Sequence, residues 1–133
     1  MDIQQITGII EDNLDEIERL EGEISKVSPE VPELSGYTDD DFILYLADQG
    51  IYSDDSDYTD YKNHLTTNYE KRHKFLTNRN YYITFNNILK NMIDFYLKYL
   101  RNPTSDELKI LSEGTGIQEN INQVIKYIED NLL

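Results

Sequence analysis

Two histidines and a run of acids are the side chains in this 133-residue chain whose types and spacing could support metal or acid–base chemistry. His64 and His73 are nine residues apart, and a helix turns about 100° per residue, so on a continuous helix they point to opposite faces. The acids that start at Asp54 resemble the opening of a calcium-binding EF-hand loop. A loop counted from Asp55, however, has Asp60 where the turn needs Gly and Thr66 where a bidentate Glu is needed. We therefore predict no metal site, and we interpret these acids as a solvated helix cap.

Other catalytic arrangements are also missing from the sequence. The chain has no Cys, which excludes a disulfide scaffold, a thiolate metal site and a Cys nucleophile. It has no Gly-rich phosphate loop, no zinc-protease helix motif and no nucleophile-elbow pentapeptide. We expect a protein that is not an enzyme and that has no cofactor.

The spacing of the apolar residues predicts helices, because these residues recur at helical rather than alternating intervals. We predict an all-α fold of five to six helices, in which a long heptad-patterned arm (1–27) docks on a central helical hairpin within a helical domain (28–133). The arm ends at Ser28-Pro29, since Pro disfavours helix in the residue before it. The helices expected in the domain are 38–50, 57–77, 80–101, 104–113 and 117–131, with 81–100 as the central, most apolar segment.

Local signals support these boundaries. Capping-box pairs predict three helix starts, at Thr38 with Asp41, at Thr104 with Glu107 and at Thr115 with Gln118. The stretch 78–80 either ends one helix or lies inside a longer one.

The arm carries a heptad seam that needs a partner helix. Its first apolar position is always Ile, and Asn13 interrupts the second position, where it is expected to cost stability and to set the register. The predicted helix interface is Ile3, Ile6, Ile10, Asn13, Ile17, Leu20, Ile24 and Val27. The flanking residues include Glu16, Glu21 and Glu23, so pairing two arms with each other would bring like charges together.

The net charge of −14 is unevenly distributed along the chain. Residues 1–60 hold 18 acids against two bases, and residues 61–102 hold eight bases against two acids. We therefore expect the arm to dock on the 57–101 region, of the same copy or of a neighbouring one. The predicted basic contact patch is Lys62, Lys71, Arg72, Lys74 and Arg79. The predicted acidic contact patch is Asp39, Asp40, Asp41, Asp54, Asp55, Asp57 and Asp60.

The segment ELKILSEGTGIQENINQVIKYI (107–128) resembles a helix-turn-helix motif. Leu111 matches the packed position of the first helix, and Gly116-Ile117 matches the turn. Ile121 and Val124-Ile125 match the packed positions of the second helix. In the recognition helix that the resemblance implies, the candidates are Gln118, Glu119, Asn122, Gln123 and Lys126, of which Gln and Asn can read the edges of adenine. Of these five residues only Lys126 is positively charged, whereas contacts with DNA phosphates need several Lys and Arg side chains. We therefore interpret the segment as a helical corner.

Three functions remain as hypotheses. The first is a non-enzymatic helical structural or assembly subunit that acts through helix–helix and charge-complementary contacts with copies of itself or with other assembly subunits. A phage virion is one setting, because the richness in Ile, Asn, Tyr and Lys is what AT-rich codons encode. The alternative is an acidic inhibitor that imitates nucleic acid and blocks a basic groove of a host protein. The second alternative is a helix-turn-helix transcription regulator.

The sequence also bears on location. The acidic N-terminus lacks the pattern of a signal peptide, and no run of about 18 apolar residues is present to span a membrane. We expect a protein of the cytoplasm or of a virion.

Overall fold

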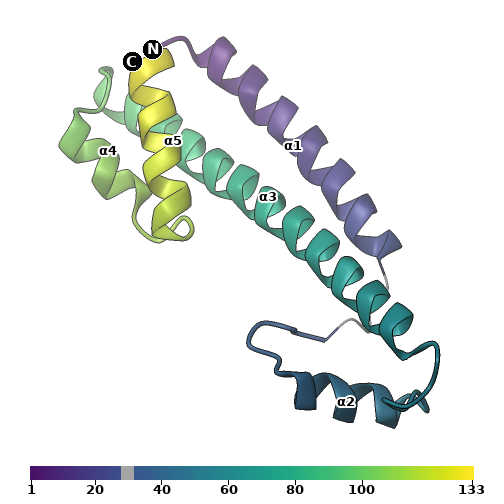
Figure 1. Ribbon diagram of the computed structural model, residues 1–133. Coiled ribbons are helices and arrows are strands. Elements are labelled where there is room, and N and C mark those ends of the chain that lie inside the picture. The colour runs from purple at the N-terminus through teal and green to yellow at the C-terminus, as the bar shows by residue number, and fades with distance from the viewer. Residues whose placement is uncertain (28–31) are drawn as a thin grey trace. The chain divides into compact units, whose positions relative to one another are not determined.

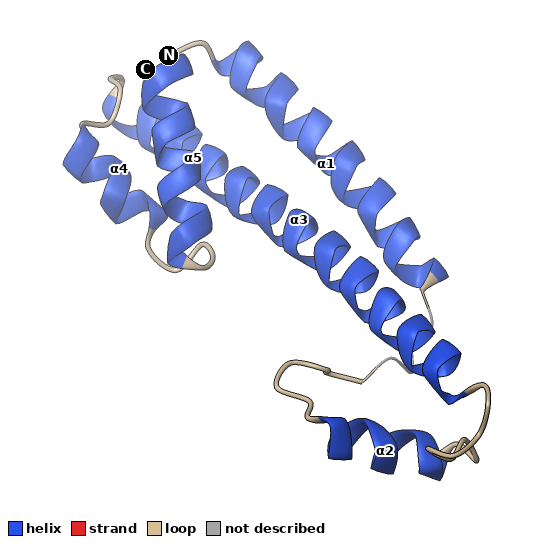
Figure 2. Ribbon diagram, viewed as in Figure 1, coloured by secondary structure: helices blue, strands red, loops and turns tan. Residues whose placement is uncertain are grey.

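The computed structural model describes residues 1–27 and 32–133. The helices are α1 (Ile3–Lys26), α2 (Asp39–Asp48), α3 (Tyr58–Tyr99), α4 (Ser105–Ser112) and α5 (Gln118–Asn131) (Figure 1). The described ranges contain no strand (Figure 2), which confirms the predicted all-α fold. Within them, no helix combines the length and apolar character needed to cross a bilayer. The expected helix end at Ser28-Pro29 lies outside the described residues.

Helix α3 replaces the predicted central hairpin, and that prediction is wrong. Its 42 residues run without interruption through 78–80, over about 63 Å at 1.5 Å per residue. The stretch holds Asn78, Arg79 and Asn80 but no Pro or Gly. Asn costs only about 0.7 kcal/mol relative to Ala inside a helix, which is too little to end a helix that packs on both sides of this point.

Two of the three predicted capping boxes are confirmed. The Asp41 and Glu107 amides donate to the hydroxyls of Thr38 and Thr104, each at 3.3 Å, and the acid side chains accept from the cap amides at 2.9 and 3.0 Å. The third prediction is wrong, because α5 begins after Ile117, which makes no side-chain cap bond. The Thr115 hydroxyl instead donates to the carbonyl of Ser112 at 2.7 Å, closing the turn after α4.

The chain divides into two compact units, and the first contains Met1–Gly22 and Leu76–Leu133. Its core is built from apolar residues of α1, α3, α4 and α5, centred on Ile88, Leu89 and Met92, which have no exposed surface. The prediction that 81–100 is the central segment holds for most of its length. Its last two residues, Tyr99 and Leu100, are the exception, since they are 51% and 78% exposed.

The second unit contains Glu23–Phe75. Val27, Leu34 and Leu46 are buried in it. The Tyr69 hydroxyl of α3 donates to the carboxylate of Glu33, which attaches the segment before α2 to this helix. That hydrogen bond lowers the pKa of Glu33 and raises the pKa of Tyr69.

Candidate interaction surfaces

The predicted heptad seam of α1 faces inward along its whole length. Ile10 and all four residues at the second seam position are buried, and the other three Ile are half-buried. The buried seam residues are Ile6, Ile10, Asn13, Leu20 and Val27, and the half-buried ones are Ile3, Ile17 and Ile24. The partner helix expected from the heptad pattern is therefore present within the same chain.

Two buried amides mark the contact between α1 and α3. The Asn13 Nδ2 group donates to Asn86 Oδ1 at 2.9 Å, and Asn86 Nδ2 donates to the carbonyl of Ile10 at 3.2 Å. Both Asn side chains are less than a tenth exposed. The two helices run antiparallel (Figure 1), so residue numbers fall along α3 as they rise along α1. Because Asn13 and Asn86 are hydrogen-bonded, any α1 and α3 residues whose numbers sum to 99 lie at the same height along the helix pair.

The facing surface of α3 was missed in the sequence, although it has a seam of its own. Tyr82, Asn86, Leu89 and Ile93 follow the same four-three spacing as the seam of α1, and each is buried or half-buried. The signal that could have found it is Asn86, which occupies a seam position as Asn13 does. A polar residue in a seam is matched most cheaply by another polar residue.

Ion pairs do not provide the expected link between the acidic arm and the basic residues of α3. The four pairs that we describe are Glu16–Arg19, Glu23–Lys26, Asp39–Lys62 and Glu107–Arg101, at 2.5 to 3.3 Å. The first two lie within α1, and none of the four joins α1 to α3. The described contacts between the two helices are apolar, with one pair of amides.

The five residues of the predicted basic patch differ in their surroundings. Lys62 pairs with Asp39 at 3.3 Å and lies 4.9 Å from the ring centre of Phe42. Lys71 and Lys74 are exposed, whereas Arg72 and Arg79 are half-buried. The five basic residues therefore differ in exposure and in partners, and they do not form one uniform contact surface.

The seven residues of the predicted acidic patch all lie in the second unit and are all exposed. Three of them serve the chain itself: Asp39 pairs with Lys62, Asp41 caps α2, and Asp55 accepts from the Tyr52 amide at 2.8 Å. The remaining four are Asp40, Asp54, Asp57 and Asp60. Among the described residues, no group of three or more His, Asp or Glu is placed to hold a metal ion.

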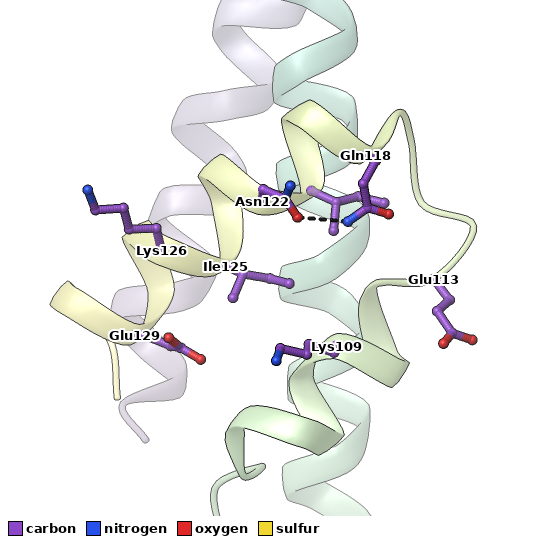
Figure 3. A pocket seen from close by; sticks show the side chains of 8 residues that line it. Lys109, Glu113, Gln118, Asn122, Ile125, Lys126 and Glu129 are labelled. Atoms are coloured by element: carbon purple, nitrogen blue, oxygen red, sulfur yellow. Dashed lines mark hydrogen bonds between the residues drawn. The ribbon is translucent and has the colours of Figure 1, made fainter.

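Helices α4 and α5 form the corner that resembles a helix-turn-helix, and a groove of about 440 Å³ lies between them (Figure 3). Lys109 and Glu113 line its α4 side, and Gln118, Asn122 and Lys126 line its α5 side. The Gln118 amide donates to Asn122 Oδ1 at 2.7 Å, so these two base-reading candidates engage each other.

Packing inside the α4–α5 corner differs in one position from the resemblance. Leu108, not Leu111, is the fully buried apolar residue of α4, while Ile121 and Val124 of α5 are buried as expected. Gly116 lies against α3, where a Cβ atom would be only 2.0 Å from the Thr84 hydroxyl. The turn glycine therefore serves a close approach to α3.

The end of α3 and helix α4 border an apolar pocket of about 420 Å³. Phe95, Tyr99 and Ile110 line it, and Arg101 stacks over the Phe95 ring at 5.1 Å while it binds Glu107 through two hydrogen bonds. Beside the pocket, Leu100 has φ +55°, a left-handed conformation that usually belongs to Gly.

The α1–α3 pair has two sides, and α5 covers one of them. There, Ile9 of α1 and Phe85 of α3 pack with residues of α5 in the core. At about 100° per residue, Leu14 lies across the seam from Ile9, and Ile83 lies across the seam from Phe85.

We call the opposite side of the pair the uncovered side and define it by Leu14, Ile83, Lys90 and Leu97. The last three are seven residues apart and form one ridge of α3. Leu14, Ile83 and Leu97 are 49%, 36% and 61% exposed, and Lys90 is exposed as well. Sequence reasoning did not identify this surface, because its exposure depends on where α4 and α5 pack.

Comparisons of the chain with protein-family models, with curated proteins and with solved structures find no match, so its function is inferred from these surfaces.

Proposed function

We propose that the protein is a non-enzymatic helical structural subunit, and that it assembles by binding a second copy of itself through the uncovered side. The observation that carries the proposal is the exposure of Leu14, Ile83 and Leu97 on one side of a helix pair whose other side is packed. Helices in bundles bury such faces against further helices.

The packing of the α1 seam against α3 favours the uncovered side over the seam as the contact surface. Because the heptad residues of α1 already pack on α3, an arm-to-arm contact through that seam would require the pair to open. A contact through the uncovered side keeps the α1–α3 pair intact and buries three aliphatic side chains. Burial of each such side chain contributes about 1.5 to 3 kcal/mol when it is complete.

The other surfaces support assembly less directly. Three of the seven acids that would imitate nucleic acid take part in hydrogen bonds or ion pairs of this chain. The exposed part of α5 that would enter a DNA groove includes Glu119, Glu129 and Asp130 beside Lys126. Anions at a DNA-facing surface weaken binding through repulsion by phosphates.

The test is the mass of the purified protein by light scattering over a range of concentrations. We expect a dimer or larger species that dissociates on dilution. Leu14→Glu should shift the protein to monomer, since it places a charge within the contact. The matched control is Ile110→Glu on α4, where the side chain is 65% exposed and lines a pocket with none of the four residues that define the uncovered side. A wild-type protein that stays monomeric at about 0.5 mM, well above typical weak-complex dissociation constants, would contradict the proposal.

A further inference from the structure

The uncovered side is divided lengthwise by charge. Its α1 half carries the exposed acids Glu11, Glu18 and Glu21 around Leu14. Its α3 half carries the exposed Lys90 between Ile83 and Leu97, the half-buried Arg79 one turn before Ile83, and one exposed acid, Asp94, one turn after Lys90, so its charge is positive on balance. An acidic helix and a basic helix thus lie next to each other on one face.

Two symmetric arrangements can bring this face against the same face of a second copy. A two-fold axis perpendicular to the helices places α1 on the partner's α1 and brings acids against acids. A two-fold axis parallel to the helices places α1 on the partner's α3 and brings acids against bases. Like charges across an interface oppose association, and complementary charges favour it.

We propose that two copies pair with the axis parallel to the helices, so that α1 of each copy lies against α3 of the other in an antiparallel four-helix arrangement. This inference rests on the proposed function and adds its geometry. The interface is isologous, so every contact occurs twice.

The register of this dimer follows from the amide pair. Rotation about an axis parallel to the helices leaves every residue at its own level along that axis. Since Asn13 and Asn86 lie at one level, Glu11 falls within one helical turn of a Lys90 side chain across the interface. By the same relation, Leu14 falls within one turn of Ile83, and Glu18 within one turn of Arg79, across the interface.

The size of the face is compatible with a weak dimer. The part of α1 in the first unit, Ile3–Gly22, is about 30 Å long, and two adjacent helices are about 20 Å wide. The face therefore measures about 600 Å² on each copy, or about 1,200 Å² in total, at the lower end of specific interfaces. We expect a dissociation constant on the order of 10 µM.

Charge reversal tests the pairing. In sedimentation equilibrium, Glu11→Lys and Lys90→Glu should each weaken the dimer by about tenfold, and the double variant should return to within about threefold of wild type. Independent losses that multiply in the double variant would overturn the inference.

Cross-linking gives a second readout, because the chain has no Cys of its own. A mixture of the Leu14→Cys and Ile83→Cys proteins, oxidised under mild conditions, should form the mixed disulfide dimer. Leu14→Cys alone should form little cross-linked dimer. Efficient cross-linking of Leu14→Cys alone would identify the α1-on-α1 arrangement and overturn this one, while the proposed self-association would stand. A monomeric wild-type protein would overturn both.

Discussion

Asn13 and Asn86 join their side-chain amides at 2.9 Å across the buried seam between α1 and α3. They are 73 positions apart in the chain, and each is the polar residue of its own seam. Each amide that lost its partner would remain buried with unmet hydrogen-bonding capacity. The pair therefore opposes a shift of α1 along α3, since a shift of one heptad in either direction would place Asn86 against an apolar seam residue, Ile6 or Leu20.

The first prediction concerns this pair. Asn13→Leu and Asn86→Leu should each lower the free energy of unfolding by about 1 to 3 kcal/mol, because each leaves one buried amide unsatisfied. The double variant should lose less than the sum, with a coupling of at least about 0.5 kcal/mol. Urea unfolding measures all three, and Asn87→Leu, at the neighbouring exposed site of α3, is the control. Strict additivity would show that the amides act independently.

The second prediction uses two glycines that differ in their surroundings. Gly116→Ala should lower the free energy of unfolding by about 1 to 3 kcal/mol, because the new Cβ would meet the Thr84 side chain at 2.0 to 3.0 Å. The same change at Gly8, a helical position where an added Cβ would meet no atom of another element or side chain within 4 Å, should raise it by up to about 1 kcal/mol. Thermal unfolding of the two variants checks the opposite signs. Adding Thr84→Ala to Gly116→Ala should recover part of the loss, and a failure to do so would place the strain elsewhere.

The third prediction concerns Leu100, whose φ of +55° carries a steric cost for any residue with a Cβ. Leu100→Gly should raise the free energy of unfolding by about 1 kcal/mol, since the 78% exposed side chain contributes little packing. Leu100→Ala shortens the side chain but keeps the Cβ, so it should give no comparable gain. Equal effects of Gly and Ala in chemical denaturation would argue against strain at this residue.

The fourth prediction is a pH dependence. Hydrogen bonds from Arg101, and then from the Thr104 amide, lower the pKa of Glu107 from 4.5 to about 2. Because the pKa is lower in the folded protein than in the unfolded chain, the ionised carboxylate stabilises the fold above about pH 4.5. This contribution is lost as the pH falls from about 4.5 to about 2.

Glu107→Gln should accordingly flatten the dependence of unfolding free energy on pH within that window, and should lower stability at neutral pH through loss of the charged cap. Chemical denaturation at several pH values between about 2 and 7 measures both effects. Glu113→Gln, at an exposed residue just after α4, is the control for the loss of one negative charge. If the unfolding free energy of Glu107→Gln fell with acidity between about pH 4.5 and 2 as steeply as that of the wild type, the carboxylate of Glu107 would not be the source of this pH dependence.

The fifth prediction separates assembly from nucleic-acid imitation. Replacing Asp40, Asp54, Asp57 and Asp60 together by Asn should leave the self-association constant within about threefold of wild type, since these residues lie in the second unit and outside the proposed contact. Sedimentation equilibrium at moderate salt gives the constant. A large loss of association would identify the acids as the contact surface and would favour a charge-driven function.

Features set by neighbouring residues could be predicted from the sequence. The caps at Thr38 and Thr104 depend on residues three positions apart, and both form as expected. The inward face of α1 also follows from local periodicity, because seven apolar side chains on one stripe have to be buried.

Features set by distant packing could not be predicted. Whether 78–80 ends a helix depends on small propensity costs weighed against the burial of residues before and after it. The burial of Asn86 could not be predicted from its polar side chain, because it depends on the position of α1. The uncovered side was hidden for the same reason, since Ile83 and Phe85 are alike in sequence and differ only in what packs on them.

The distance along the chain between the two halves of the seam has a consequence during synthesis. Asn13 leaves the ribosome 73 residues before Asn86, which at 5 to 20 residues per second is roughly 4 to 15 s. Throughout this interval the apolar stripe of α1 has no partner, and nascent chains on one messenger are close together. Glu16, Glu21 and Glu23 beside the stripe repel another unfinished arm. We therefore expect the acids of α1 to disfavour pairing between unfinished chains until α3 has been synthesised.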